Sequence, residues 1–147
     1  MPGYSGTSLA KKLGIRQGSN VALVGVPAEV MAEIQAALSS CRVAANGRGP
    51  FDFVFLFAKS QAEFRRLLRK MTNALASAGM LWVSWPKKAS GVPTDLTEDV
   101  IRQSGLKAGL VDVKVCAVTD VWSGLKFVIP LKNRPKAEAG PVKNRGA

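Results

Sequence analysis

Residues 52–57 read DFVFLF, and this run decides the fold class. Every residue after Asp52 is apolar, without the polar alternation of a half-exposed strand. A continuous apolar run of this kind is typical of a strand in a mostly parallel sheet that helices cover on both faces. Two similar runs, NVALVGV at 20–26 and MLWVSW at 80–85, predict further buried strands, and CRVAA at 41–45 predicts a weaker one. The sequence therefore predicts an α/β fold.

Two segments between these strands have apolar residues at helical spacing and are predicted to be helices. Residues 28–39 follow Pro27, which a helix tolerates in its first turn. Residues 60–78 are expected to form a helix that Ser60 caps and Gly79 ends. This alternation of strand and helix favours a largely parallel sheet, in which each helix connects two strands.

The C-terminal part of the pattern differs, because two strands follow each other with only a short connection. A capping box formed by Asp95 and the glutamate three residues later predicts a helix over 96–107. The segments VDVKVCAVTD at 111–120 and LKFVIPL at 125–131 predict two strands joined by a turn at 121–124. Their alternation is partial, so we expect an antiparallel hairpin at the edge of the sheet, less buried than the earlier strands.

Length and composition limit the class of protein. The 147 residues fit one domain, which we place at 1–131, followed by a disordered basic tail at 132–147. No apolar stretch approaches the roughly 20 residues of a membrane span, and the N-terminus lacks the apolar core of a signal peptide, so we expect a cytoplasmic protein. The absence of histidine excludes Ser-His-Asp triads and histidine metal sites. Cys41 and Cys116 cannot build a zinc site alone and are expected to be reduced and mostly buried.

The formal net charge of +11 is the main clue to a partner. Part of it lies in the predicted tail, which has five basic residues and one acidic residue. A basic surface favours polyanions, and nucleic acid is the commonest polyanion in a cell. The alternative is that the charge serves solubility and a disordered basic tail.

The order of elements from Gly49 to Leu131 resembles the C-terminal half of a class I methyltransferase domain. FDFVFLF, a helix, AGMLWVSWPK, a second helix and a strand hairpin follow one another as they do in that family. The resemblance implies a three-layer, Rossmann-like fold with a mostly parallel sheet of about six strands and a C-terminal antiparallel hairpin. It also implies a site for S-adenosylmethionine.

The N-terminal half departs from the methyltransferase pattern. VALVGVPAEV contains Gly25 alone, where those enzymes have a GxGxG-type loop that approaches the methionine part of the cofactor. CRVAANGRG contains no acidic residue for the ribose hydroxyls, and a third strand is missing.

The whole chain resembles a more specific group, a bacterial family of short proteins whose function is unknown. Three blocks carry this resemblance: GYSGTSLAKKLGI at 3–15, WPKKASGVPTDLTEDV at 85–100 and VDVKVCAVTDVWSGLKFVI at 111–129. The resemblance covers roughly residues 1–131. It implies one compact domain and names no activity.

A ligand of an open α/β sheet binds at the carboxyl ends of the strands, near the point where the strand order reverses. With a methyltransferase-like order, that crevice lies between the strands at 20–26 and 52–57. Gly25 would then line one side of the crevice, and Lys59 and Ser60 would line the other.

The loop at 86–94, PKKASGVPT, is expected to open on the same edge and has the composition of an anion site. Lys87 and Lys88 supply positive charge, Ser90 supplies a hydroxyl, and Gly91 permits close approach of the backbone. The helix that follows adds the positive end of its dipole. The alternative is an exposed basic turn between a strand and a helix.

Three tryptophans could stack on a base. Trp82 lies in the middle of a predicted strand and is expected in the core, and Trp122 falls in the predicted hairpin turn. Trp85 stands at a strand end beside Lys87 and is the better candidate for stacking.

These observations favour a non-catalytic domain that binds an anionic ligand. The ligand would be either nucleic acid or a phosphate-bearing small molecule such as a nucleotide. We find no convincing acid–base pair, and we expect no catalytic residue, no cofactor and no metal. The alternatives are a divergent S-adenosylmethionine-dependent methyltransferase and a scaffold that oligomerises through its edge hairpin. The predicted ligand-binding residues are Gly25, Lys59, Ser60, Trp85, Lys87, Lys88, Ser90 and Gly91.

Overall fold

A computed structural model describes residues 7–44 and 48–134 of the chain. Its helices and strands, in chain order, are α1 (Leu9–Leu13), β1 (Asn20–Val24), α2 (Ala28–Leu38), β2 (Arg42–Val43), β3 (Phe51–Phe57), α3 (Gln61–Asn73), β4 (Leu75–Pro86), α4 (Glu98–Lys107), β5 (Val111–Ala117) and β6 (Trp122–Val128). Short 3-10 turns lie at Lys88–Ser90 and Leu131–Asn133. None of the helices in this part of the chain is long and apolar enough to cross a membrane.

The strands form one sheet in the order β2-β1-β3-β4-β6-β5. β1 pairs in parallel with β2 and β3, β3 pairs in parallel with β4, and β6 runs antiparallel to both β4 and β5. This confirms the predicted mostly parallel, six-stranded sheet with a C-terminal antiparallel hairpin. The strand order reverses between β1 and β3, so the expected crevice position follows from the observed topology.

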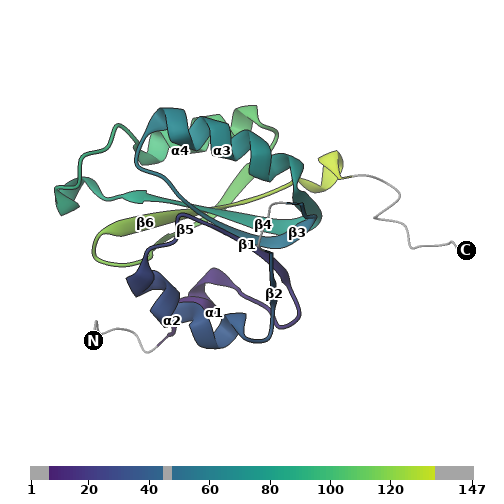
Figure 1. Ribbon diagram of the computed structural model, residues 1–147. Coiled ribbons are helices and arrows are strands. Elements are labelled where there is room, and N and C mark those ends of the chain that lie inside the picture. Colours follow the sequence, from purple (N-terminus) through teal and green to yellow (C-terminus); the bar gives the residue numbers. More distant parts are fainter. Residues whose placement is uncertain (1–6, 45–47, 135–147) are drawn as a thin grey trace, which may run out of the picture.

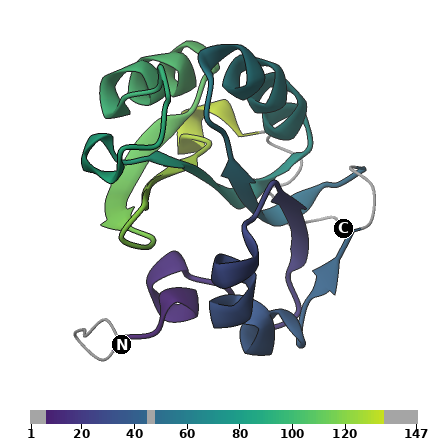
Figure 2. The same ribbon diagram turned by 60° about the vertical axis from the view of Figure 1, so that its left-hand side comes forward.

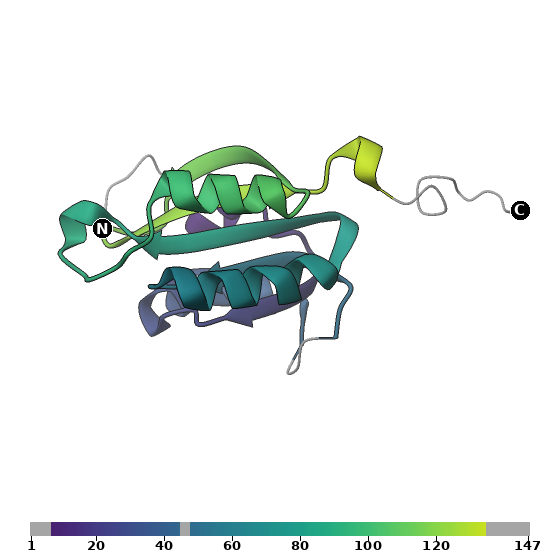
Figure 3. The same ribbon diagram turned by 90° about the horizontal axis from the view of Figure 1, so that it is seen from above.

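Helices cover both faces of the sheet, with α3 and α4 on one face and α1 and α2 on the other (Figure 1). Seen from above, α3 and α4 lie side by side across the sheet (Figure 3). β3 shows why its sequence does not alternate: Phe53, Phe55 and Phe57 pack in the cluster under α1 and α2, whereas Val54 and Leu56 pack in the cluster under α3 and α4. All five are at most 4% exposed.

The predicted end of the third helix is wrong. α3 ends at Asn73 rather than at residue 78, and Gly79 lies inside β4 instead of stopping a helix. The cause is pairing with β3: Leu75 is the register partner of Phe51, whose backbone N–H donates to the Ala74 carbonyl over 2.8 Å. Leu75 is buried as the first residue of β4.

The hairpin turn lies three residues earlier than predicted, at 118–121 instead of 121–124. The N–H groups of Val118 and Thr119 both donate to the carbonyl of Trp122, which closes the turn. Trp122 therefore opens β6, where it is 7% exposed and packs edge-to-face on Phe57 with ring centroids 4.9 Å apart. Of the expected edge pair, β5 alone is the edge strand, and β6 lies inside the sheet.

Several smaller expectations also need correction. Thr97, and not Asp95, caps α4 by accepting from the N–H of Val100. The two cysteines are free but half-buried rather than mostly buried. Residues 132–134, which we assigned to the tail, are part of the described chain: Arg134 donates from Nε to the Ile129 carbonyl over 2.9 Å. The rest of the predicted tail, 135–147, lies outside the described residues.

Candidate functional site

The turn between β1 and α2 forms one side of the expected crevice. Gly25 has a φ of +68°, which a side chain rarely tolerates, and a Cβ there would lie 3.2 Å from the Phe57 carbonyl oxygen. The turn therefore runs directly against the carboxyl end of β3. Pro27 occupies the N-cap position of α2 and provides no side-chain hydrogen bond to the first turn. The first N–H groups of α2 thus have no side-chain acceptor, although Glu29 adds a negative charge there.

The other side of the crevice is the turn between β3 and α3, where the predicted Ser60 cap is confirmed. Ser60 Oγ accepts from the N–H of Glu63 over 3.2 Å, and Glu63 Oε1 accepts from the N–H of Lys59 over 3.2 Å. The hydroxyl of Ser60 is therefore engaged in capping. The Lys59 carbonyl accepts from Thr94 Oγ1 over 2.6 Å, which ties the end of the long β4–α4 loop to this turn.

Asp95 completes that tie. Its carboxylate accepts from the N–H of Gln61 over 2.8 Å, and its carbonyl accepts from the Gln61 side-chain amide over 2.8 Å. Asp95 thus caps α3, whose first residue lies 34 positions earlier in the chain, and not α4 as predicted. The N-termini of α3 and α4 are both occupied by protein acceptors, so neither provides the open helix end that we expected beside the 86–94 loop.

The 86–94 loop is attached at its start to the β5–β6 turn and at its end to the turn after β3. The N–H of Lys87 donates to the Val121 carbonyl over 2.7 Å, which holds the loop against the β5–β6 turn. Ser90 turns its hydroxyl inward to the Lys87 carbonyl over 2.7 Å, and Gly91 ends the short 3-10 turn. Figure 2 shows this loop beside the β5–β6 hairpin, toward the edge of the sheet that lies away from β1. Lys88 is exposed, and Lys87 is half-buried.

The tryptophans serve the core. Trp85 is 5% exposed and packs with the residues under α3 and α4, so its indole does not lie open for stacking as we expected. Trp82 is fully buried, as predicted, and its Nε1 donates to the Leu13 carbonyl over 2.8 Å. This bond attaches α1 to the sheet.

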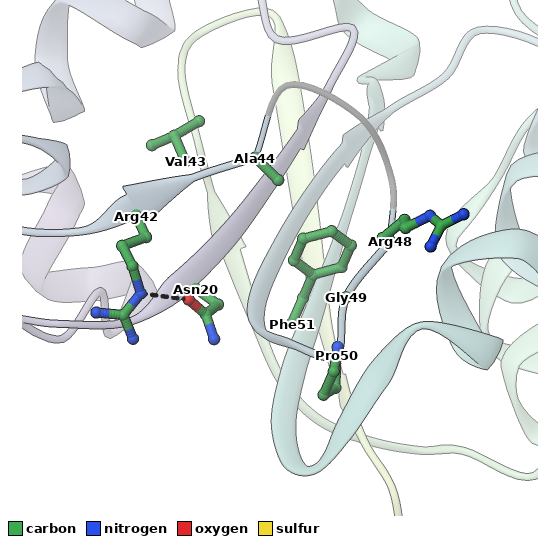
Figure 4. Close-up of a pocket in the computed structure, with 8 residues that line it drawn as sticks. All are labelled: Asn20, Arg42, Val43, Ala44, Arg48, Gly49, Pro50 and Phe51. Carbon is green, nitrogen blue, oxygen red and sulfur yellow. Dashed lines mark hydrogen bonds between the residues drawn. The ribbon is translucent and has the colours of Figure 1, made fainter.

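A cavity of about 280 Å³ lies at the opposite edge, beside the amino ends of β1 and β3 (Figure 4). Arg42 Nε donates to Asn20 Oδ1 over 2.8 Å. The guanidinium of Arg48 points away from these two residues (Figure 4). Asp52 also lies at this edge and accepts from the N–H of Asn20. The cavity is lined by Asn20, Arg42, Val43, Ala44, Arg48, Gly49, Pro50 and Phe51.

Sequence reasoning did not identify this cavity, because its residues come from three separate strand starts. It borders residues 45–47, which lie outside the described chain. Ligands of open α/β sheets bind at the carboxyl edge. We therefore regard the β1–β3 crevice, and not this cavity, as the candidate site.

Charged and nucleophilic groups reveal no catalytic arrangement in the described residues. Every ion pair there involves Arg102, which bonds Glu98 and Asp112, and the pKa of Asp112 is lowered mainly by the Arg102 hydrogen bond. Burial raises the pKa of Cys116, opposed by Lys114 and a second lysine, which disfavours a thiolate nucleophile. Residues 7–44 and 48–134 contain no group of three side chains that could hold a metal.

Solved structures with a similar fold include methyltransferases. An O-methyltransferase from neocarzinostatin biosynthesis, crystallised with S-adenosylmethionine, matches with a TM-score of 0.58 and 12% identity over 76% of this chain and 49% of its own. A SAM-dependent methyltransferase from Aquifex aeolicus matches with a TM-score of 0.56 and 15% identity over 83% and 88%. Magnesium protoporphyrin IX methyltransferase from Synechocystis PCC 6803, with bound SAH, matches with a TM-score of 0.55 and 12% identity over 83% and 78%.

At such low identity these likenesses establish the fold alone, and this chain spans about half the length of the first of the three enzymes. A comparison with curated proteins finds no match. The sequence profile of one family, proteins of unknown function designated DUF3052, matches residues 10–131, which include every described helix and strand except the first residue of α1. The chain therefore belongs to the DUF3052 family.

Proposed function

We propose that this chain is a non-catalytic domain that binds an anionic ligand, a nucleotide or nucleic acid, in the crevice between β1 and β3. The observation that carries the proposal is the β1–α2 turn. There Gly25 brings the backbone against β3, and α2 begins without a side-chain cap. A helix start of this kind favours an anion, because its N–H groups and dipole both present positive charge.

The cations around this edge support an anionic ligand. Lys59 lies at the end of β3, and Lys87 and Lys88 follow β4. Within the described part of the chain none of the three forms an ion pair, since the pairs there converge on Arg102. Lys59 would contact the ligand directly. Lys87 and Lys88, which lie toward the hairpin, would attract a polyanion to the edge or contact the outer part of a long one.

The crevice offers few groups suited to acid–base catalysis. The chain contains no histidine, and two carboxylates at the turn after β3 serve a helix: Glu63 and Asp95 both accept backbone N–H groups at the start of α3. A group engaged in this way is poorly placed to accept a proton from a ligand. This supports binding without chemistry.

Fluorescence anisotropy with labelled single-stranded and double-stranded oligonucleotides tests the polyanion form of the proposal. Binding is expected at about 50 mM salt, where electrostatic attraction is strong, and should weaken steeply as salt rises. The Lys59→Ala and Lys87→Ala/Lys88→Ala variants should bind at least about tenfold more weakly. A Lys143→Ala/Arg145→Ala variant removes equal charge from the C-terminal segment and serves as the matched control. Equal losses in the loop and control variants would mean diffuse attraction and no site at this edge.

A divergent methyltransferase is the second candidate, favoured by the fold of the solved structures that bind S-adenosylmethionine or its product. Calorimetry with S-adenosylmethionine and S-adenosylhomocysteine separates the two candidates. Saturable micromolar binding that a Gly25→Val substitution abolishes would favour the enzyme. A flat titration at millimolar cofactor would exclude the enzyme and leave the binding domain.

A further inference from the structure

Four basic side chains gather on the face of the sheet beside α1. We name Lys12, Arg16, Lys114 and Lys126 the basic cluster. Lys12 belongs to α1, Arg16 follows it, and Lys114 and Lys126 are register partners on β5 and β6. Figure 2 shows α1 beneath the hairpin that these two strands form. The cluster therefore joins residues from two ends of the chain that lie about a hundred positions apart.

The sheet register explains why the cluster lies where it does. One row of register partners crosses four neighbouring strands: Phe55 on β3, Trp82 on β4, Lys126 on β6 and Lys114 on β5. α1 covers the inner part of this row, since the Leu13 carbonyl accepts from Trp82 Nε1. Lys126 is the next residue outward, at the margin of that cover, and is half-buried. Its ammonium group is thus partly removed from water without lying in the core.

Lys114 is held in position by a hydrogen bond. Its Nζ donates to the Lys12 carbonyl over 3.0 Å, at the C-terminal end of α1, where the helix dipole favours a cation. This bond fixes one ammonium group directly across from Lys126 on the neighbouring strand. Like charges directly opposite each other on adjacent strands repel, and this pair is therefore unfavourable unless something neutralises it.

No acidic side chain provides that neutralisation within the described residues. α1 and β6 contain no acidic residue, and Asp112 on β5 turns to the opposite face, where it pairs with Arg102 of α4. Burial, together with the charges of Lys114 and Arg16, lowers the pKa of Lys126. Within residues 7–44 and 48–134, the cluster is therefore a concentration of positive charge without a counter-charge.

We propose that the basic cluster binds a phosphate group, which supplies the missing negative charge between Lys114 and Lys126. The hydrogen bond that positions Lys114 and the partial desolvation of Lys126 both strengthen a charge-assisted contact with an oxyanion. The site lies on the α1 face of the sheet and is separate from the crevice at the carboxyl ends of β1 and β3. The phosphate belongs either to a small molecule or to a nucleic-acid backbone.

Calorimetry of the full chain with pyrophosphate at low salt tests this site. The wild-type protein should give a saturable titration, and the Lys114→Met/Lys126→Met variant should bind at least about tenfold more weakly. Methionine keeps the apolar stem of each side chain and removes its charge. The Arg66→Met/Arg69→Met variant removes two exposed charges from α3 on the opposite face and should bind as the wild type does. No saturable heat at millimolar pyrophosphate, or equal losses in both variants, would overturn the proposal.

Two further arms make the result independent of folding and of the proposed function. In the wild-type protein, pyrophosphate should shift the NMR signal of the Trp82 indole N–H, because Trp82 is the neighbour of Lys126 on β4. Shifts confined to other regions would place the anion elsewhere and refute the site. The Trp82 signal reports on the row that contains Lys126 and not on the 86–94 loop, so failure of the crevice proposal leaves this result unaffected. Competition by a single-stranded oligonucleotide at lower concentration than a free nucleotide would identify nucleic acid as the source of the phosphate.

Discussion

The Asp95 carboxylate accepts a hydrogen bond from the Gln61 N–H over 2.8 Å, so it caps α3 across 34 positions of sequence. Beside it, Thr94 donates to the Lys59 carbonyl over 2.6 Å. Together these bonds attach the end of the β4–α4 loop to the turn after β3. They close off the start of α3 and leave the start of α2 as the uncapped helix end of the β1–β3 crevice.

Replacing Asp95 with alanine should destabilise the protein by about 1 kcal/mol, because a lost N-cap typically costs that amount. Asp95→Asn retains an oxygen acceptor and should lose less. Urea denaturation measures both. Asp120→Ala, at an exposed position in the β5–β6 turn, is the control and should leave the transition midpoint unchanged. A midpoint for Asp95→Ala equal to the wild-type value would show that the cap contributes nothing.

Gly105→Ala should destabilise the protein although it lies within a helix. Alanine normally gains about 1 kcal/mol over glycine in a helix interior. Here the new Cβ would lie 2.2 Å from Cε1 of Phe127, a fully buried ring that cannot move aside freely. Overpacking of this kind costs about 1–3 kcal/mol, so we expect a net loss in chemical denaturation. Gln103→Ala, at an exposed position of the same helix, should be neutral or slightly stabilising.

The ion pair between Arg102 and Asp112 predicts an acid-sensitive contribution to stability. Arg102 Nε donates to Asp112 Oδ2 over 3.0 Å, and this bond lowers the carboxyl pKa in the folded state. A lowered folded pKa stabilises the protein above the unfolded pKa of about 3.9, and the stabilisation is lost as pH falls through the folded pKa.

Asp112→Asn should therefore lower the thermal midpoint at neutral pH, and the difference from wild type should shrink as pH falls below about 4. Thermal unfolding of both proteins over a pH series checks this. A difference that stays constant down to the acid limit would show that the carboxyl charge is not the source of the stabilisation.

Lys126→Met should stabilise the protein in the absence of a phosphate ligand. Removing one of two opposed like charges on neighbouring strands is worth roughly 0.2–1 kcal/mol. Because the folded pKa of Lys126 is lowered, the penalty is present at neutral pH and is relieved as pH rises through that pKa. The thermal midpoint of the variant should therefore exceed that of the wild type by less in alkaline solution than at neutral pH. Lys107→Met, which removes a cation from the last turn of α4, should instead be neutral or slightly destabilising.

Much of the architecture follows from local pattern. The apolar run at 52–57 predicted a strand covered on both faces, and β3 divides its side chains between two core clusters. Ser60, as the expected cap, predicted where α3 begins. The order of strands and helices predicted a largely parallel sheet, and the position of the β1–β3 crevice follows from that order. Each of these features depends on residues within a few positions of one another or on the order of elements along the chain.

Other features were decided by contacts between distant segments. Pairing of Leu75 with Phe51 ended α3 early, and burial of Trp122 against Phe57 shifted the hairpin turn. The sequence around Asp95 predicted a cap on α4, but in the folded chain the Asp95 carboxylate accepts from the N–H of Gln61 at the start of α3.

The basic cluster is the clearest case. Lys12 and Lys114 are 102 positions apart, and no local pattern links them. Sequence periodicity reports which face of an element is apolar, because that depends on neighbouring residues. It does not report which polar group on another element lies opposite, since that depends on sheet register and helix placement, which tertiary packing alone determines.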